Sequence, residues 1–157
     1  MFPVLIIGYG NVLRGDDAVG PLAARCLAAR LADQPVKIIE AHQLLPEMAW
    51  LLSQAQLVVL IDAAIGAAAG AVRWQRLERA EEQRSMALGV VGHHLTCQQL
   101  LAGCQTLYGA SPEVLLIAVA GKTFEVGEEL SEDVQEVLPS LVDQVERIVR
   151  QHLSGVH

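Results

Sequence analysis

Two acidic positions of this sequence could take part in chemistry, because each lies where a predicted strand ends. Asp16 and Asp17 follow a glycine-rich turn and open a predicted helix, while Asp62 ends a run of four aliphatic residues. Adjacent acids at a helix start can simply cap that helix, and an aspartate after a strand can form an Asx turn. Ligands of α/β proteins nevertheless bind beyond the carboxyl ends of strands, so both positions are also candidate ligand sites.

Histidines supply the second kind of candidate group. His93 and His94 precede a predicted helix, and His42 follows another predicted strand. In an extended segment the side chains of His93 and His94 point to opposite sides, so only one of them would reach a common point. Two carboxylates and an imidazole suit a divalent first-row metal with open coordination positions. The candidate residues are far apart in the chain, so no local spacing confirms such a site.

Short apolar runs alternate with amphipathic segments, and this alternation predicts the elements that position these side chains. Strands are predicted at residues 3–9, 36–40, 57–61, 71–77 and 114–120, and helices at 18–31, 45–52, 96–108 and 131–153. The order indicates an α/β three-layer sandwich with a five-stranded, mostly parallel, twisted sheet. Residues 62–70 are too few for a parallel crossover, so strand 71–77 is predicted to be antiparallel and to lie at an edge.

Two helix details follow from single residues. Thr96 and Ser131 are predicted N-caps of the helices that they precede. Pro46 is expected near the first turn of its helix, where proline is tolerated. Pro139 is expected to kink or restart the last helix, because proline cannot donate to the helical hydrogen-bond ladder.

Length and composition restrict the class of protein. The 157 residues, 52% hydrophobic and 18% charged, predict a single domain over residues 1–157 and exclude intrinsic disorder. The net charge of −7, with no basic stripe, argues against nucleic acid and anionic membrane surfaces as partners. No signal peptide or membrane span is expected, and three cysteines without C-x-x-C spacing suggest a reducing, cytoplasmic environment. The acidic surface is compatible with a monomer.

Three segments together resemble the maturation endopeptidases of nickel–iron hydrogenases. These segments are GYGNVLRGDDAVG at 8–20, LVVLIDAA at 57–64 and GHHLT at 92–96, and the likeness extends from residue 3 to about residue 150. The resemblance implies a peptidase that removes the C-terminal extension of a hydrogenase large-subunit precursor after nickel insertion. Nickel carried by the precursor would be the recognition handle, and another divalent metal could substitute for it.

The resemblance also implies roles for particular residues. Carried over by position, Asp17, Asp62 and His93 would bind the metal, and both aspartates would take part in catalysis. Asp16 would be the helix-capping partner, and His94 would face away from the metal. If the first and third predicted strands are neighbours, the two aspartates meet in one crevice, where a cation would relieve their repulsion.

Contacts to the substrate tail are expected from two further residues. Asn11 belongs to the glycine motif, and His42 lies in the segment EAHQLLPEM after the second predicted strand. This segment differs from the glycine-rich loop that the family often has there, and Ala18 replaces a usual glycine.

Two other functions are compatible with the same residues. The first is a self-sufficient metallopeptidase that holds its own metal and cleaves small peptides. The second is a non-enzymatic nickel-site docking or chaperone module, which would bind the precursor without shortening it. Metal content, turnover of short peptides and the mass of the precursor after incubation separate these alternatives.

Overall fold

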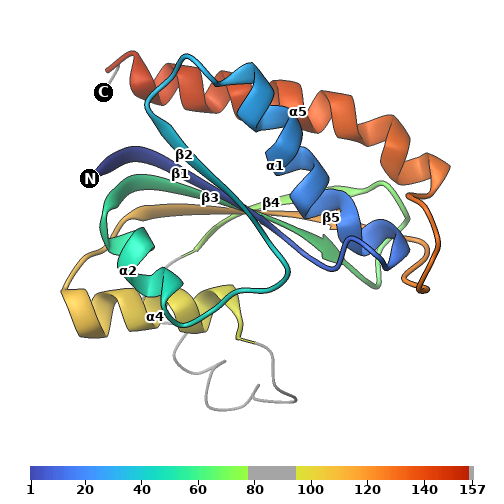
Figure 1. Cartoon of the computed structure of the whole chain (residues 1–157), viewed down its shortest axis with the longest axis horizontal. Coiled ribbons are helices and arrows are strands. Elements are labelled where there is room, and N and C mark those ends of the chain that lie inside the picture. Colours follow the sequence, from blue (N-terminus) through green and yellow to red (C-terminus); the bar gives the residue numbers. More distant parts are fainter. Residues whose placement is uncertain (78–94, 156–157) are drawn as a thin grey trace.

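One five-stranded sheet, in the order β2-β1-β3-β5-β4, lies between two helical layers (Figure 1). The computed structural model describes residues 1–77 and 95–155. The strands are β1 Phe2–Tyr9, β2 Val36–Ala41, β3 Ala55–Ala64, β4 Val72–Leu77 and β5 Glu113–Ala120. The helices are the 3-10 helix η1 Gly15–Ala18 and the α-helices α1 Val19–Arg30, α2 Met48–Ser53, α4 Cys97–Tyr108 and α5 Glu132–Leu153.

Four strands are parallel, and the edge strand β4 is antiparallel to its neighbour β5. This arrangement confirms the predicted α/β class, the mostly parallel sheet and the antiparallel edge strand. The connection from β3 to β4 does not join adjacent strands, because β5 lies between them. The connection passes the end of β5, where the Gly70 N–H donates to the Ala120 carbonyl at 2.8 Å and the Gly121 N–H to the Ala64 carbonyl at 2.9 Å.

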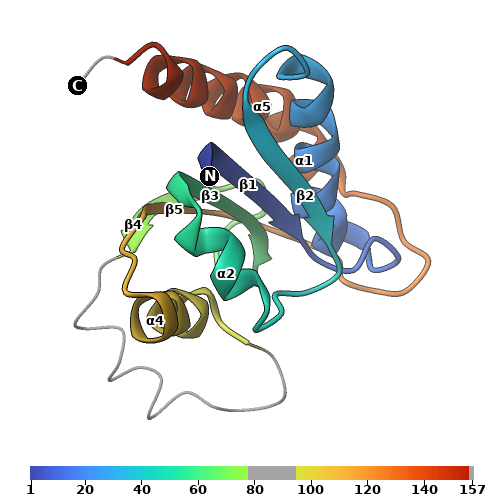
Figure 2. The same cartoon turned by 60° about the vertical axis from the view of Figure 1, so that its left-hand side comes forward.

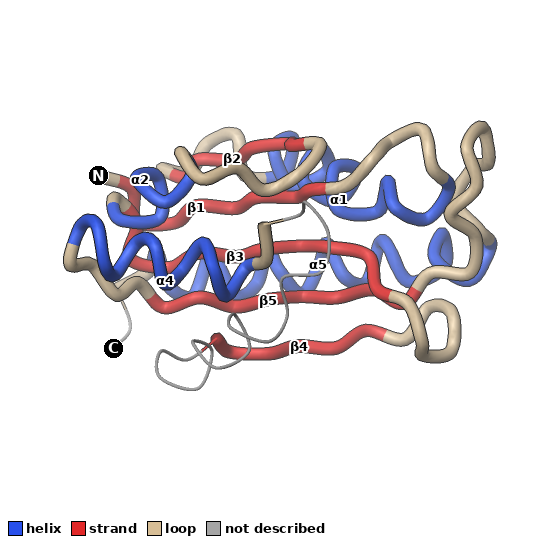
Figure 3. Tube along the Cα trace, turned by 90° about the horizontal axis from the view of Figure 1, so that it is seen from below, coloured by secondary structure: helices blue, strands red, loops and turns tan. Residues whose placement is uncertain are grey.

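The carboxyl ends of β1, β3 and β5 lie at one end of the sheet, and the loops that follow them gather there (Figure 3). We call this end the carboxyl edge. β1 and β3 pair directly, with Gly8 opposite Ile61. The condition stated for the crevice, that the first and third predicted strands are neighbours, is therefore met. This pairing brings the segment that contains Asp17 to the same edge as Asp62.

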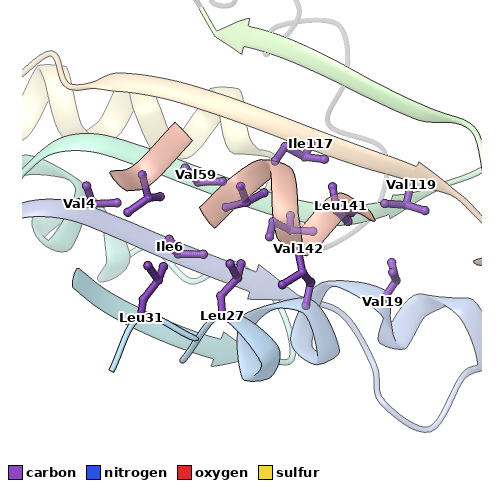
Figure 4. Packing of buried hydrophobic residues seen from close by; sticks show 14 of the residues in the cluster. Val4, Ile6, Val19, Leu27, Leu31, Val59, Ile117, Val119, Leu141 and Val142 are labelled. Atoms are coloured by element: carbon purple, nitrogen blue, oxygen red, sulfur yellow. The ribbon is translucent and has the colours of Figure 1, made fainter. Parts of the chain in front are cut away.

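Alternating side chains of the strands point to two separate cores. In β1, Val4 and Ile6 pack against α1 and α5, whereas Leu5 and Ile7 pack on the opposite face, which α2 and α4 cover (Figures 2 and 4). All four side chains are fully buried. Both faces of the sheet are covered, which is why its central strands read as continuous apolar runs rather than alternating ones.

The helices α4 and α5 begin at their predicted N-caps, whereas α2 begins later than predicted, after Pro46. Thr96 forms a capping box with Gln99, and the Ser131 hydroxyl accepts the Val134 N–H, as expected of N-caps. α2 begins only at Met48, because Pro46 belongs to a preceding turn, in which the Ala49 N–H donates to the Pro46 carbonyl.

The predicted restart of the last helix at Pro139 is wrong. α5 runs as one helix through this residue from Glu132 to Leu153. Its buried valines and leucine on one side hold it against the sheet, and this packing outweighs the loss of one backbone hydrogen bond. No α-helix in the described parts of the chain is both long and apolar enough to cross a bilayer.

Candidate active site

Two glycines let the start of α1 approach the ends of β1 and β3. A Cβ atom on Gly8 would lie 2.0 Å from the Gly20 carbonyl oxygen, and one on Gly20 would lie 2.5 Å from the Ile61 carbonyl oxygen. No side chain larger than a hydrogen atom fits at such distances. Gly8 and Gly20 therefore allow α1 to pack closely against β1 and β3. The consequence is that the acid pair preceding α1 is held at the carboxyl edge.

Asp17 is fixed by the glycine turn in front of it. Its Oδ2 accepts the Asn11 N–H at 2.7 Å, and a Cβ atom on Gly10 would lie 2.0 Å from the Asp17 carbonyl oxygen. Gly10 also has a φ of +150°, which side chains other than hydrogen rarely allow. A backbone N–H thus holds the carboxylate of the half-buried Asp17. The hydrogen bond from Asn11 uses Oδ2 and does not involve Oδ1.

Asp62 and Tyr9 point to the same face of the sheet. Asp62 follows Leu60 by two residues and Tyr9 follows Ile7 by two, so both side chains lie on the face covered by α2 and α4. Asp62 Oδ1 accepts the Ala63 N–H at 2.7 Å, and the Tyr9 side chain is hydrogen-bonded to the Asp62 carboxyl. Sequence analysis did not single out Tyr9, although strand alternation places it beside Asp62.

Burial dominates the electrostatics of this pair. Burial raises the pKa of Asp62 to about 7; hydrogen bonds from Ala63 and Tyr9 oppose the rise, and the negative charge of Asp17 adds to it. The pKa of Tyr9 is likewise raised, by burial first and then by the charge of Asp62, so its hydroxyl stays protonated and can donate to Asp62. The negative charge of Asp17 makes the smallest of these contributions to the pKa of Asp62.

Asp16 does not cap its own helix, which corrects the sequence prediction. Neither η1 nor α1 has a side-chain cap. Instead, the fully buried Asp16 carboxylate accepts the N–H groups of Lys122, Thr123 and Ser131 at 2.7, 3.2 and 2.7 Å and the Ser131 hydroxyl at 2.8 Å. Burial alone would raise the pKa of Asp16, but these four bonds outweigh it and lower the pKa below its usual value. Asp16 therefore joins η1 to the loop between β5 and α5.

The two predicted substrate-binding residues lie at the same edge. The Asn11 side-chain oxygen accepts the Leu13 N–H at 2.9 Å, so it holds its own turn. His42 is exposed and follows Ala41, the last residue of β2, whose carbonyl accepts the Gly10 N–H at 3.0 Å. The loop that carries Asn11 and the end of β2 are consequently adjacent.

The predicted ligand His93 and its neighbour His94 lie outside the described residues. The described part of this region starts at Leu95, and the first residue of α4 is Cys97, which belongs to the buried cluster that Tyr9 packs against. The N-terminus of α4, four residues after His93 in the sequence, is thus on the same face of the sheet as Tyr9 and Asp62. Within residues 1–77 and 95–155 no group of three metal-ligating side chains is found.

Asp17 and Asp62 together fit one face of a divalent-cation site. Both are oxygen donors, the burial of Asp62 and the negative charge of Asp17 disfavour the ionised form of Asp62, and a cation would favour it. A complete site needs at least one further donor, because two carboxylates alone do not make the three protein ligands usual for catalytic metals.

A cleft of about 760 Å³ lies elsewhere, beside β4 and the last turns of α5. Leu57 and Glu113, at the starts of β3 and β5, are among its lining residues, which places it at the opposite end of the sheet from Asp17 and Asp62. Its lining includes Trp74 and His152 but no pair of carboxylates, so it is not the candidate active site.

Several solved structures of similar fold are hydrogenase maturation proteases or peptidases. HycI, a nickel–iron hydrogenase maturation protease from Thermococcus kodakarensis, is 24% identical with a TM-score of 0.75, covering 94% of this chain and 92% of that chain. A hydrogenase 2 maturation peptidase from a Thaumarchaeota archaeon is 26% identical with a TM-score of 0.69, covering 93% and 97%. The hydrogenase maturating endopeptidase HybD from E. coli is 21% identical with a TM-score of 0.71, covering 96% and 93%.

Sequence comparison gives the family directly. No curated protein sequence matches this chain significantly. The sequence model of the HycI family, described as hydrogenase maturation protease, matches residues 21–148, which is most of the chain. The chain therefore belongs to the hydrogenase maturation protease family and is a peptidase of the hydrogenase maturation endopeptidase type.

Proposed function

We propose that this peptidase removes the C-terminal extension of a nickel–iron hydrogenase large-subunit precursor after nickel insertion. One observation carries the proposal. In this member of the hydrogenase maturation protease family, the segment that contains Asp17 and the end of β3 that contains Asp62 both lie at the carboxyl edge. We propose further that it works as a single-domain monomer in the cytoplasm.

Asp17, Asp62 and His93 are the proposed ligands of the precursor's nickel, and Asn11 and His42 the proposed contacts to its tail. Nickel held there would anchor the precursor and could polarise the scissile carbonyl. Both aspartates are the proposed catalytic residues. In hydrolysis a water molecule adds to the scissile carbonyl, the C–N bond breaks, and the amine takes up a proton. A carboxylate beside the scissile bond is suited to accept a proton from the attacking water and to return it to the leaving amine.

Nickel dependence is the first test of this function. The chain is incubated with nickel-loaded and with nickel-free large-subunit precursor, and the products are weighed by mass spectrometry. We expect loss of the tail from the loaded form only, because only that form offers the metal to the carboxylates. Equal cleavage of both forms would refute nickel as the recognition handle.

The same experiment separates the alternative functions. A tightly held metal in the isolated chain, together with turnover of short peptides, would identify a self-sufficient metallopeptidase instead. Binding of the precursor without any change in its mass would identify a docking or chaperone module.

The choice of histidine is tested by a matched pair of variants. We expect His93→Ala to reduce processing of the loaded precursor by at least about 100-fold, the usual scale for loss of one transition-state interaction. His94→Ala is expected to process at the wild-type rate, because its side chain would point away from the metal. Rates are measured by gel shift of the precursor. A damaging His94→Ala with a harmless His93→Ala would assign the ligand to the other histidine.

A further inference from the structure

Apart from Ile65, which follows β3 and is 83% exposed, three large apolar side chains are exposed in two loops at the carboxyl edge. Val12 and Leu13, between β1 and η1, are 52% and 66% exposed, and Val126, between β5 and α5, is 66% exposed. We call these three residues the apolar rim. Single exposed apolar residues are ordinary on protein surfaces, but a group of them beside a candidate site is typical of an interaction surface.

The two loops of the rim are held together by backbone hydrogen bonds. The Gly127 N–H donates to the Leu13 carbonyl at 2.9 Å, which makes Leu13 and Val126 neighbours across the loops. The Asp16 N–H donates to the Thr123 carbonyl at 2.8 Å, and the buried Asp16 carboxylate adds its four bonds to the same loop and the start of α5. The rim is therefore one surface rather than two independent loops.

The rim is also fixed relative to Asp17. The loop that carries Val12 and Leu13 begins with Asn11, whose N–H holds the Asp17 carboxylate at 2.7 Å. The rim therefore begins one residue after the group that holds Asp17, at the same edge of the sheet.

We propose that the apolar rim is the docking surface for the hydrogenase large-subunit precursor, which contacts it through an apolar patch bordered by basic side chains. This proposal rests on the proposed function, since it takes the precursor as the substrate. The rim contributes affinity for the folded precursor independently of its nickel.

Charge favours the precursor over a second copy of this chain as the occupant. The two loops of the rim, residues 11–14 and 121–133, carry five exposed acids (Glu125, Glu128, Glu129, Glu132 and Asp133) against two exposed bases, Arg14 and Lys122. Two copies meeting through the rim would bring these acidic segments together, and like charges at an interface oppose association. A partner with basic side chains around its apolar patch would complement them.

Binding of nickel-free precursor tests the rim without requiring cleavage. The double variant Leu13→Ser/Val126→Ser is compared with the wild type and with Leu107→Ser, using biolayer interferometry on immobilised nickel-free precursor. Leu107 is a matched control, because it is 69% exposed and lies in the last turn of α4, close in sequence to the start of β5 at the opposite end of the sheet. We expect the dissociation constant of the double variant to rise at least about tenfold, because two apolar contacts are lost. Leu107→Ser is expected to bind as the wild type does.

Cleavage and oligomeric state complete the test. With loaded precursor, the double variant is expected to show a raised KM and an unchanged kcat, since the rim binds the precursor and does not touch the reacting bond. Unchanged binding, equal weakening by Leu107→Ser, or a wild-type dimer that the double variant dissociates would each overturn the proposal. Binding that depends on the rim while no tail is removed would instead contradict the proposed function and leave the rim standing.

Discussion

Asp17→Asn and Asp62→Asn are each expected to reduce processing of nickel-loaded precursor by at least about 100-fold. Asparagine keeps the shape of aspartate but removes the negative charge, so the neutral side chain binds a cation poorly and cannot accept the proton of an attacking water. The loss should appear in kcat/KM, measured by mass spectrometry of the precursor over time.

A change of stability would not account for this loss. Asparagine at position 62 removes a charge that burial and Asp17 disfavour, but it leaves one acceptor oxygen for two donors, Ala63 and Tyr9, so we expect the free energy of unfolding to fall by no more than about 1–3 kcal/mol. Urea denaturation of each variant checks this point. Asp33→Asn is the control, because the Asp33 side chain is 73% exposed and far from the carboxyl edge in its ion pair with Arg150. Wild-type rates in both site variants would show that these carboxylates are not the active site.

Asp16→Asn is expected to lower the free energy of unfolding by about 2–4 kcal/mol, the range for removing a buried charged acceptor of several hydrogen bonds. Every partner of the Asp16 carboxylate is a donor: three N–H groups and the Ser131 hydroxyl. An asparagine offers one acceptor oxygen and turns its amide N–H groups toward those donors, so buried donors lose their partner. The lowered pKa of Asp16 has the same cause, since these bonds stabilise the ionised form.

The measurement is urea denaturation at neutral pH, with Asp33→Asn again as the exposed control, which is expected to change stability by no more than about 0.5 kcal/mol. Ser131→Ala provides a graded comparison, because it removes one bond to Asp16 and the N-cap of α5 while leaving three N–H donors in place. We expect it to cost about 1 kcal/mol. A variant Asp16→Asn as stable as the wild type would contradict the role of Asp16 as the link from η1 to the loop between β5 and α5.

The contrast between Asp16 and Asp17 shows how adjacent residues of one type acquire separate tasks. Asp16 faces inward and is fully buried, while Asp17 is half-buried and faces the turn at Gly10 and Asn11. The 3-10 helix that contains both residues turns them in different directions. Of two adjacent acids in a sequence, one can therefore stabilise the fold while the other lies at the candidate site.

Much of the fold could be predicted because its signals are local. The apolar runs of β1, β3 and β5 predicted buried strands, and Thr96 and Ser131 predicted the starts of α4 and α5, since strand burial and N-caps depend on neighbouring residues. The short connection before β4 also indicated its antiparallel direction. The place of β5 between β3 and β4 was not predicted, because strand order depends on pairing between distant segments.

For the candidate site, the residue types, the family resemblance and the two strand ends that carry the carboxylates could be read from the sequence. The surroundings of these carboxylates could not. The partners of Asp16 are 106 to 115 residues away, and the bond between Tyr9 and Asp62 depends on β1 lying next to β3. The physical reason is that burial and hydrogen bonding, which set the charge of a carboxyl group and hence its role, arise between segments that come together only when the chain folds.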